Sequence, residues 1–200
     1  MKKKIKKNLL FHVCCAPCAS YISSVRLAPH YNITWYFDNP NILSQIEYDR
    51  RLDMVKLMAD KFNFDLIIEP YEHQGWLEMT RGHERDPEGG ARCMLCYHSR
   101  LRDTVKLAKA KNFDLFGTSL LVSPYKDIKA LRSISRALAK EYKISFLDED
   151  FQADNGYQHS QNLARELGLY RQKFCGCEYS VLTTKAKNLP DDVKKCSFMI

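Results

Sequence analysis

The 200-residue sequence has no apolar segment long enough to cross a membrane. No stretch approaches the ~20 apolar residues that a spanning helix requires. A signal peptide is also lacking, because the apolar run Leu9–Val13 is interrupted by His12 and precedes no small-residue cleavage site. The run is also shorter than the ~7–15 residues of a signal-peptide core. We therefore predict a cytoplasmic protein that makes no membrane contact.

Internal repeats, low-complexity segments and dividing linkers are equally absent, which predicts a single domain over residues 1–200. Within it, residues 1–7 form a basic arm and residues 188–200 a tail without clear pattern. The formal net charge is +7, and five of the basic residues lie in Lys2–Lys7. This charge is compatible with a polyanionic partner such as RNA, and equally with a solvated lysine arm.

Five apolar runs alternate with segments of helical periodicity, which predicts an α/β domain with a mostly parallel sheet covered by helices. The predicted strands are Asn8–Val13, Ile33–Phe37, Phe64–Pro70, Phe113–Leu120 and Lys143–Asp148. The predicted helices are Ser44–Phe62, Cys96–Asn112 and Asp127–Tyr142. Because ligands bind beyond the carboxyl ends of parallel strands, the segments that follow the first, second and fourth strands should meet in one crevice.

Eight cysteines are the most informative feature of the composition. In a reducing compartment a disulfide framework is not expected, so grouped thiols indicate metal binding or redox chemistry. Seven of the eight fall into three groups: Cys14, Cys15 and Cys18; Cys93 and Cys96; and Cys175 and Cys177. Cys196 stands alone, which is typical of a small buried apolar side chain.

The first two groups together offer a set of metal ligands. Cys14 and Cys15 end the first strand, and Cys93 and Cys96 lie near a helix start, whose N-terminus should lower their thiol pKa. Four thiolates suit tetrahedral zinc or an iron–sulfur cluster. Cys18 either packs behind this loop or binds a further metal.

The third group leaves two roles open. Because a single glycine separates Cys175 from Cys177, a disulfide between them would close a small, strained and easily reduced ring. A metal-binding pair is the other role that this spacing allows.

The sequence resembles QueH-type epoxyqueuosine reductases over roughly residues 8–182. The motifs that carry the resemblance are "LLFHVCCAPC", "YFDNPNI" with "EYDRRL", "GGARCMLCYHSRL", "TSLLVSPYKD" and "GLYRQKFCGCEYS". The resemblance implies an adenine-nucleotide-hydrolase-like (HUP-like) α/β sandwich. It also implies removal of the epoxide oxygen from epoxyqueuosine in tRNA, which gives queuosine at the wobble position without cobalamin.

The resemblance also implies roles for the cysteines. Cys14, Cys15, Cys93 and Cys96 would bind a [4Fe–4S] cluster, Cys175 and Cys177 would form a redox-active disulfide, and Cys18 would help to hold an additional iron. An external electron donor would then be required. Two residues depart from the family pattern: Asp38 stands where an aromatic residue is expected, and Phe174 replaces a tyrosine.

Other residues of these motifs are predicted to contact the tRNA substrate. The predicted substrate-binding residues are Asn39, Asn41, Tyr97, Ser123, Tyr170 and Arg171. Tyr170 and Arg171 would stack on or contact an unpaired base. Arg100, Arg102 and Lys126 are offered to the tRNA phosphates; the alternative for Arg100 and Arg102 is the solvated face of a helix, which is favoured for Arg102. Tyr97, Asp38 and His12 are the candidate proton donors.

Two other classes of protein remain as alternatives. A PP-loop-type tRNA-thiolating enzyme needs a glycine-serine-rich phosphate cradle after the first strand. The sequence has "CCAPCAS" there, so ATP use is not expected. A non-catalytic RNA-binding domain stapled by zinc would use four thiolates, but it would leave Cys175 and Cys177 without a role.

Overall fold

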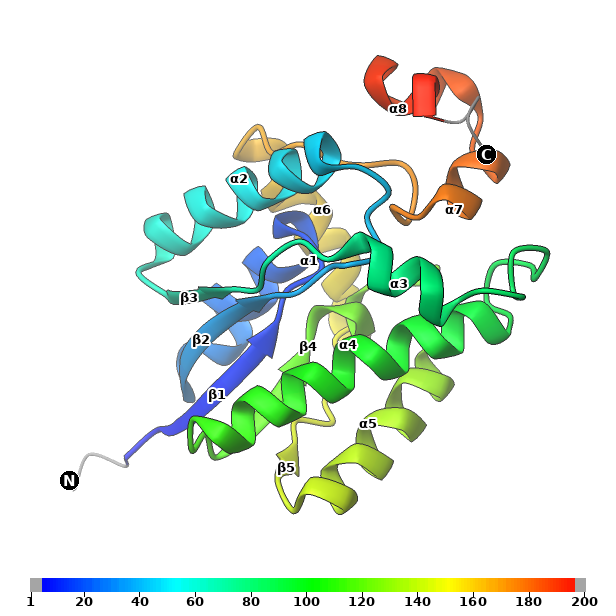
Figure 1. The fold of residues 1–200 in the computed structure, drawn as a ribbon. Coiled ribbons are helices and arrows are strands. Elements are labelled where there is room, and N and C mark those ends of the chain that lie inside the picture. The colour runs from blue at the N-terminus through cyan, green and yellow to red at the C-terminus, as the bar shows by residue number, and fades with distance from the viewer. Residues whose placement is uncertain (1–4, 197–200) are drawn as a thin grey trace.

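A parallel sheet of five strands forms the centre of the protein, in the order β3-β2-β1-β4-β5 (Figure 1). The structure, a computed structural model, describes residues 5–196, apart from the side chains of residues 186, 195 and 196. The strands are β1 (Lys7–His12), β2 (Tyr31–Phe37), β3 (Asp65–Ile68), β4 (Leu115–Thr118) and β5 (Ser145–Phe146). All pairings between these strands are parallel, which confirms the predicted α/β class.

All five predicted strands are present, and most are shorter than predicted. The predicted strand Phe113–Leu120 stops at Thr118, because Ser119–Val122 turns into a short 3₁₀ helix, η2. β5 is reduced to two residues, which pair only with Leu115 and Phe116 of β4 at the edge of the sheet. β1 has the predicted length and β2 is longer than predicted, so an apolar run locates a strand correctly without giving its ends.

Helices cover both faces of the sheet (Figure 1). α4 and α5 pack against each other on one face, and α1, α2 and α6 pack together on the other. The helices are α1 (Ala16–Tyr21), continued by a π-helical segment η1 (Ile22–Leu27), α2 (Gln45–Phe62), α3 (His73–Met79), α4 (Ala91–Ala110), α5 (Ile128–Tyr142), α6 (Gly156–Glu166), α7 (Glu178–Thr183) and α8 (Asp191–Cys196). Short 3₁₀ turns lie at Ala153–Asn155 and Ala186–Asn188.

The three predicted helices correspond to α2, α4 and α5. Ser44 caps α2, since its hydroxyl accepts a hydrogen bond from the Glu47 backbone N–H at 3.3 Å. Asn63 ends the same helix in the left-handed conformation, with a φ of 54°. α4 begins at Ala91, five residues before the predicted start, so Cys93 and Cys96 both lie within the helix.

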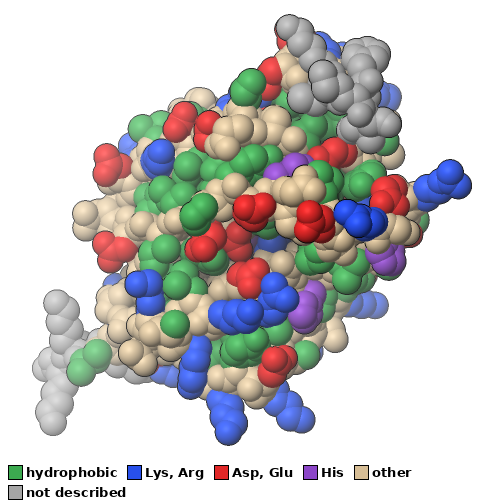
Figure 2. Space-filling model, in the orientation of Figure 1, with side chains coloured by type: hydrophobic (Ala, Val, Ile, Leu, Met, Phe, Trp, Pro, Cys, Tyr) green, Lys and Arg blue, Asp and Glu red, His purple; other side chains and the backbone are tan. Residues whose placement is uncertain are grey.

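The core surrounds the three central strands. Phe11, Trp35, Phe37 and Phe116 are completely buried, as expected for a parallel sheet that is covered on both faces. Among the described helices, none is long and apolar enough to cross a membrane. The face shown in Figure 2 carries acidic side chains across its middle and Lys and Arg side chains mainly along its lower edge.

The chain end from residue 188 onward includes a helix that the sequence pattern does not reveal. Leu189 and Val193 pack against Phe174 and Val181, which forms a small apolar cluster separate from the main core. This cluster attaches α8 to the segment that carries Cys175. The predicted buried environment of Cys196, like residues 1–4 of the basic arm, lies outside the part of the chain that is described.

Candidate functional site

The site lies where the direction of the sheet order reverses, between the neighbouring strands β1 and β4. Ligands of open parallel sheets bind at such a switch point, beyond the carboxyl ends of the strands. A cavity of about 360 Å³ opens there. Its lining includes Cys14, Cys15, Cys18, Asn39, Asn41, Arg51, Glu88, Arg100, Ser123, Tyr125, Lys126, Tyr157, Gln161, Arg171, Lys173, Phe174 and Cys175. The predicted convergence of segments that are distant in the sequence is thus present.

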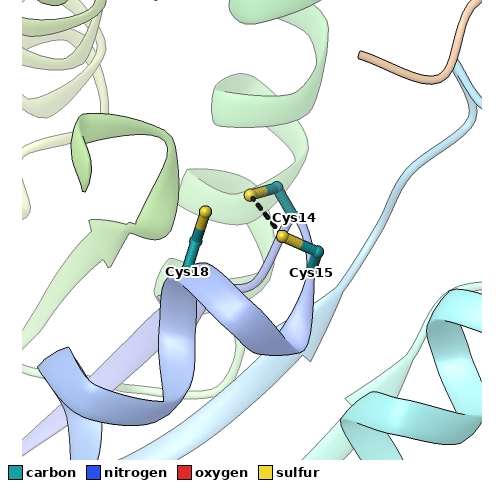
Figure 3. A group of neighbouring side chains, drawn as sticks. All are labelled: Cys14, Cys15 and Cys18. Carbon is teal, nitrogen blue, oxygen red and sulfur yellow. Dashed lines mark hydrogen bonds between the residues drawn. The ribbon is translucent and has the colours of Figure 1, made fainter. Parts of the chain in front are cut away.

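Three cysteines at the end of β1 form one group. The sulfur atoms of Cys14, Cys15 and Cys18 all lie within 4.8 Å of one another, and those of Cys14 and Cys15 are 3.8 Å apart. Figure 3 shows Cys14 and Cys15 on the loop before α1 and Cys18 on the helix, with their sulfurs close together. Pro17 lies in the first turn of α1, where proline favours helix initiation. The helix therefore carries Cys18 back toward the loop.

The pKa values of the three thiols are shifted in opposite directions, and Cys14 is the one that loses its proton most readily. Hydrogen bonds with Cys15 and Cys18 hold the pKa of Cys14 well below its usual range. The pKa of Cys15 is raised to about 12, first by its hydrogen bond to Cys14, and the pKa of Cys18 is raised for the same reason. These shifts favour a thiolate at Cys14 that accepts hydrogen bonds from two thiols, an arrangement suited to accept a metal cation.

Hydrogen bonds join the ends of the three central strands behind this group. The Cys14 N–H donates to the Ser119 hydroxyl at 2.9 Å, and that hydroxyl lies 3.2 Å from the Cys14 sulfur. The His12 ring is bonded to the Thr118 hydroxyl at 2.9 Å and to the Asp38 carbonyl at 3.0 Å. Burial, assisted by Arg100, lowers the pKa of His12 to about 3. His12 is therefore a neutral structural link.

A buried arginine stabilises the loop that follows β2. The Arg100 guanidinium donates to the Asn39 side-chain oxygen, and the Asn39 amide donates to the Val13 carbonyl at 3.0 Å. Arg100 is only 3% exposed, so the structure makes it an internal cation of the site. The alternative that Arg100 lies on a solvated helix face is therefore wrong. Its contact with the RNA backbone stays a prediction, since the side chain lines the cavity.

The loop Cys175–Gly176–Cys177 contributes Cys175 to the lining of the same cavity. The Lys126 ammonium donates to the Cys175 sulfur at 2.9 Å. Burial is the largest single influence on the pKa of Cys175 and raises it, but the charge and hydrogen bond of Lys126 together with the charges of Arg100 and Arg51 outweigh burial and lower that pKa. The pKa of Cys177 is raised to about 12 by burial and by the charge of Cys175. Both cysteines are free in the structure, so the disulfide between them stays a prediction.

Arg51 of α2 is hydrogen-bonded to the backbone of this loop. Its Nη1 donates to the Cys175 carbonyl at 2.9 Å, and its Nε donates to the Glu47 carboxylate at 2.7 Å. Gly176 has a φ of +130°, and a Cβ there would lie 3.0 Å from Arg51 Nη1. The close approach of the guanidinium and the backbone angle both explain why glycine occupies this position.

The second cysteine pair lies apart from the first group. Among the described residues, the only close set of three or more potential metal ligands is Cys14, Cys15 and Cys18. Cys96 packs instead with Cys177 and Trp76. The pKa values of Cys93 and Cys96 are raised, chiefly by burial and also by the charge of Cys175. The predicted lowering by the helix N-terminus is therefore wrong, because desolvation outweighs it.

The predicted substrate-binding residues divide between the cavity and its surroundings. Asn39, Asn41, Ser123 and Arg171 line the cavity, and the side-chain oxygen of Asn41 is buried without a hydrogen-bond partner. Tyr170 is not among the lining residues, because its hydroxyl donates to the Glu47 carboxylate at 3.0 Å. The Arg50 guanidinium lies 5.3 Å from the centre of its ring.

The other predicted contacts also differ in their surroundings. Tyr97 is buried outside the cavity lining, and its burial raises its pKa. Asp38 is buried as well, which raises its pKa to about 7 against the opposing charge of Arg100. Arg102 pairs with Asp103 at 3.2 Å on the surface of α4, as expected for a solvated helix face.

Several residues of the site do not stand out in the sequence. Arg51, Tyr125 and Tyr157 line the cavity, and Ser119 bonds to Cys14. Arg51 and Tyr125 lie inside the motifs "EYDRRL" and "TSLLVSPYKD", and membership of these motifs is the sequence feature that could have identified them as site residues. Nothing in the sequence indicates that Lys126 contacts a sulfur 49 residues further along the chain.

Fold and site together define a parallel α/β protein with a thiolate-bearing, basic cavity at the switch point of its sheet. A model of the family "Epoxyqueuosine reductase QueH" matches residues 9–183. The chain therefore belongs to the QueH family of epoxyqueuosine reductases, which are oxidoreductases of tRNA queuosine modification. The resemblance carried by the cysteine motifs is confirmed, and neither the tRNA-thiolating nor the zinc-stapled alternative is favoured.

Individual relatives support this assignment. An epoxyqueuosine reductase QueH of Streptococcus pyogenes serotype M1 is 34% identical over 185 residues, which covers 90% of this chain and 72% of the relative. That of Thermotoga maritima is 32% identical and covers 90% of this chain and 94% of the relative. Among solved structures, the U34-tRNA thiolase NcsA from Methanococcus maripaludis with its [4Fe-4S] cluster is 11% identical. It covers 82% of this chain and 67% of that chain, with a TM-score of 0.44.

Proposed function

We propose that this protein removes the epoxide oxygen of epoxyqueuosine in tRNA and thereby forms queuosine at the wobble position. The proposal rests on family membership and on one observation, the Lys126-bound sulfur of Cys175 in the same cavity as Cys14, Cys15 and Cys18. Conversion of the epoxide to an alkene consumes two electrons and two protons and releases water. The site must supply all four.

We infer that Cys175 and Cys177 are the direct source of electrons and protons. Oxidation of two thiols to a disulfide releases two electrons and two protons, so it balances the reduction of one epoxide to an alkene and water. Lys126 favours a thiolate at Cys175 whereas Cys177 keeps its proton. From that state the pair supplies two electrons and one proton, and the Lys126 ammonium, which donates to the Cys175 sulfur, supplies the second proton. An external reductant, a dithiol or a one-electron carrier, then restores the pair.

The cysteine-rich lining fits a thiolate-bound metal cofactor. A single tetrahedral ion with metal–sulfur bonds of ~2.3 Å separates its sulfur ligands by ~3.8 Å, so the distance between the Cys14 and Cys15 sulfurs fits two ligands of one ion. In a [4Fe–4S] cluster each cysteine would bind a different iron, and these two sulfurs would have to lie farther apart. A [4Fe–4S] cluster bound by Cys14 and Cys15 would take its other ligands from α4, at Cys93 and Cys96, and leave Cys18 for an additional iron. When bound, such iron supplies single electrons and Lewis acidity. With these sources of electrons, the reaction would not require cobalamin.

The basic lining of the cavity is suited to RNA. Five basic side chains line it against one acidic side chain, Glu88; the basic residues are Arg51, Arg100, Lys126, Arg171 and Lys173. Arg171 is oriented by a hydrogen bond from its Nε to the Gln161 side-chain oxygen at 3.1 Å. Phosphate contacts by such side chains would make tRNA binding weaken as salt concentration rises.

Anaerobically purified protein tests the proposal through metal analysis and turnover. Iron, sulfide and zinc contents and the absorption spectrum are measured for the wild type, Cys14→Ser, Cys175→Ser and the matched control Cys196→Ser. Epoxyqueuosine in tRNA is followed by nucleoside mass spectrometry. We expect Cys14→Ser to lose iron and Cys175→Ser to retain it, with conversion abolished in both and preserved in the control. Stoichiometric zinc without sulfide, together with no conversion by the wild type, would refute the reductase assignment.

A further inference from the structure

Two tyrosines at the cavity have no role in the chemistry described above. Tyr125 is 75% exposed, which is unusual for so large an aromatic ring. Its ring packs edge-on against Tyr157, with a centroid distance of 6.1 Å and an interplanar angle of 85°. Both tyrosines line the cavity that contains Cys18 and Cys175. The pair thus presents an aromatic surface at the opening of the reactive cavity.

The position of this pair is fixed relative to the reactive sulfur. Tyr125 directly precedes Lys126, whose ammonium lies 2.9 Å from the Cys175 sulfur. Tyr157 belongs to the first turn of α6, and α6 packs against α1, which carries Cys18. Arg171 lines the same cavity and bonds to Gln161 of α6. A polyanion that reaches Cys175 would therefore pass the aromatic pair with a cation beside it.

We propose that Tyr125 and Tyr157 form a binding site for an unpaired nucleobase that neighbours the modified nucleotide. This inference rests on the proposed function. A cavity of about 360 Å³ is comparable in size to sites for single small ligands, so it admits the modified base while its neighbours remain outside. Moving that base into the cavity breaks its stacking on those neighbours. The exposed face of Tyr125 supplies a replacement, because every base can stack on an aromatic ring.

The structure favours these tyrosines over the one that the sequence pointed to. Tyr170 already has partners, since its hydroxyl donates to Glu47 and the Arg50 guanidinium lies over its ring. Tyr125 carries its neighbour Tyr157 on one side only, and three quarters of its surface is open to solvent. Stacking on RNA bases requires such an accessible face.

The experiment combines variants of the ring with variants of the RNA. The probe is a synthetic anticodon stem-loop with guanine at the wobble position, intact or abasic at either neighbouring nucleotide. Dissociation constants are measured by fluorescence anisotropy for the wild type, Tyr125→Ala, Tyr125→Phe and Tyr157→Ala. Leu57→Ala removes another exposed apolar side chain, on α2 and outside the cavity lining, and is the control.

We expect Tyr125→Ala to weaken binding of the intact RNA on the order of tenfold, with Tyr125→Phe restoring it. The abasic RNA should bind the wild type more weakly by a similar factor, and Tyr125→Ala should cause little further loss on that RNA. With epoxyqueuosine tRNA, Tyr125→Ala should raise KM more than it lowers kcat. Unchanged affinity of Tyr125→Ala, or equal losses on intact and abasic RNA, would overturn the inference.

The outcomes separate this inference from the proposed function. A wild type that converts epoxyqueuosine tRNA while Tyr125→Ala binds normally would refute the nucleobase site alone. A wild type that binds RNA through Tyr125 but converts no substrate would refute the reductase assignment alone. Failure of the wild type to bind the stem-loop would refute the nucleobase site, and conversion of epoxyqueuosine tRNA would still decide the reductase assignment.

Discussion

Replacing Lys126 with methionine should make Cys175 less reactive toward an alkylating agent. The substitution removes the ammonium that lies 2.9 Å from the Cys175 sulfur and keeps a side chain of similar length. Because Lys126 lowers the pKa of Cys175, its loss must raise that pKa and reduce the thiolate fraction at pH 7. A hydrogen bond to a charged group contributes ~1.5–3 kcal/mol, which corresponds to roughly a 10- to 100-fold smaller thiolate fraction.

The observed rate should change by less than the thiolate fraction. A more basic thiolate is also more nucleophilic, with a Brønsted coefficient of ~0.4–0.5, so about half of the logarithmic effect is recovered. We therefore expect iodoacetamide to modify Cys175 about 3- to 10-fold more slowly at pH 7, with the pH profile displaced to higher pH. Mass spectrometry of peptide fragments distinguishes Cys175 from Cys177 in this measurement.

Two further variants serve as controls: one keeps a positive charge at position 126, and the other removes a positive charge elsewhere in the cavity lining. Lys126→Arg keeps a cation near Cys175 and should retain a profile close to the wild type. Lys173→Met removes another positive charge from the cavity lining without removing a described contact to Cys175. If Lys126→Met and the wild type react at the same rate across the pH range, Lys126 does not control Cys175 and the assignment of its role is wrong.

Two more predictions follow from the same structure. Gly176→Ala should destabilise the protein by about 1–3 kcal/mol through its φ of +130° and displace Arg51. Urea unfolding measures the loss of stability, and tRNA turnover should show that Gly176→Ala loses most of its activity. Gly82→Ala, with a φ of +85° and no atom within 4 Å of the new Cβ, should keep its activity. The pKa of Asp38 is raised to about 7, so the folded state holds a proton that the unfolded state releases. The free energy of unfolding should fall as the pH rises from 4 to 7, and Asp38→Asn should remove this part of the pH dependence. An unchanged pH dependence in that variant would contradict the assigned shift.

The sequence predicts the sheet better than it predicts the ends of the elements. Buried strands are continuous apolar runs, so β1 and β2 are recognisable without knowledge of their neighbours. α1 is not recognisable in this way, because its six residues, Ala16–Tyr21, are too few for helical periodicity to show. α6 was also missed, since its buried positions include Gly156, Ser160 and Ala164, which are small or polar.

The sequence predicts which segments meet at the site, but it does not predict which of their side chains are in contact. Because parallel strands end at one edge, residues after β1 and β4 had to meet, as Cys14 and Ser119 do. The partner of Cys175 depends on how the segment after α6 folds back over the sheet. No local pattern specifies that path, so Lys126 and Arg51 could be assigned to this loop only from the structure.

The two halves of the reactive cavity come from opposite ends of the chain. About 160 residues separate Cys14 from Cys175, which corresponds to roughly 8–30 s of synthesis at ~5–20 residues per second. During that time Cys14, Cys15 and Cys18 have left the ribosome without the loop that later encloses them. The cavity is therefore complete only after the segment that carries Cys175 has been made, and any of the three thiols oxidised before then would be absent from it.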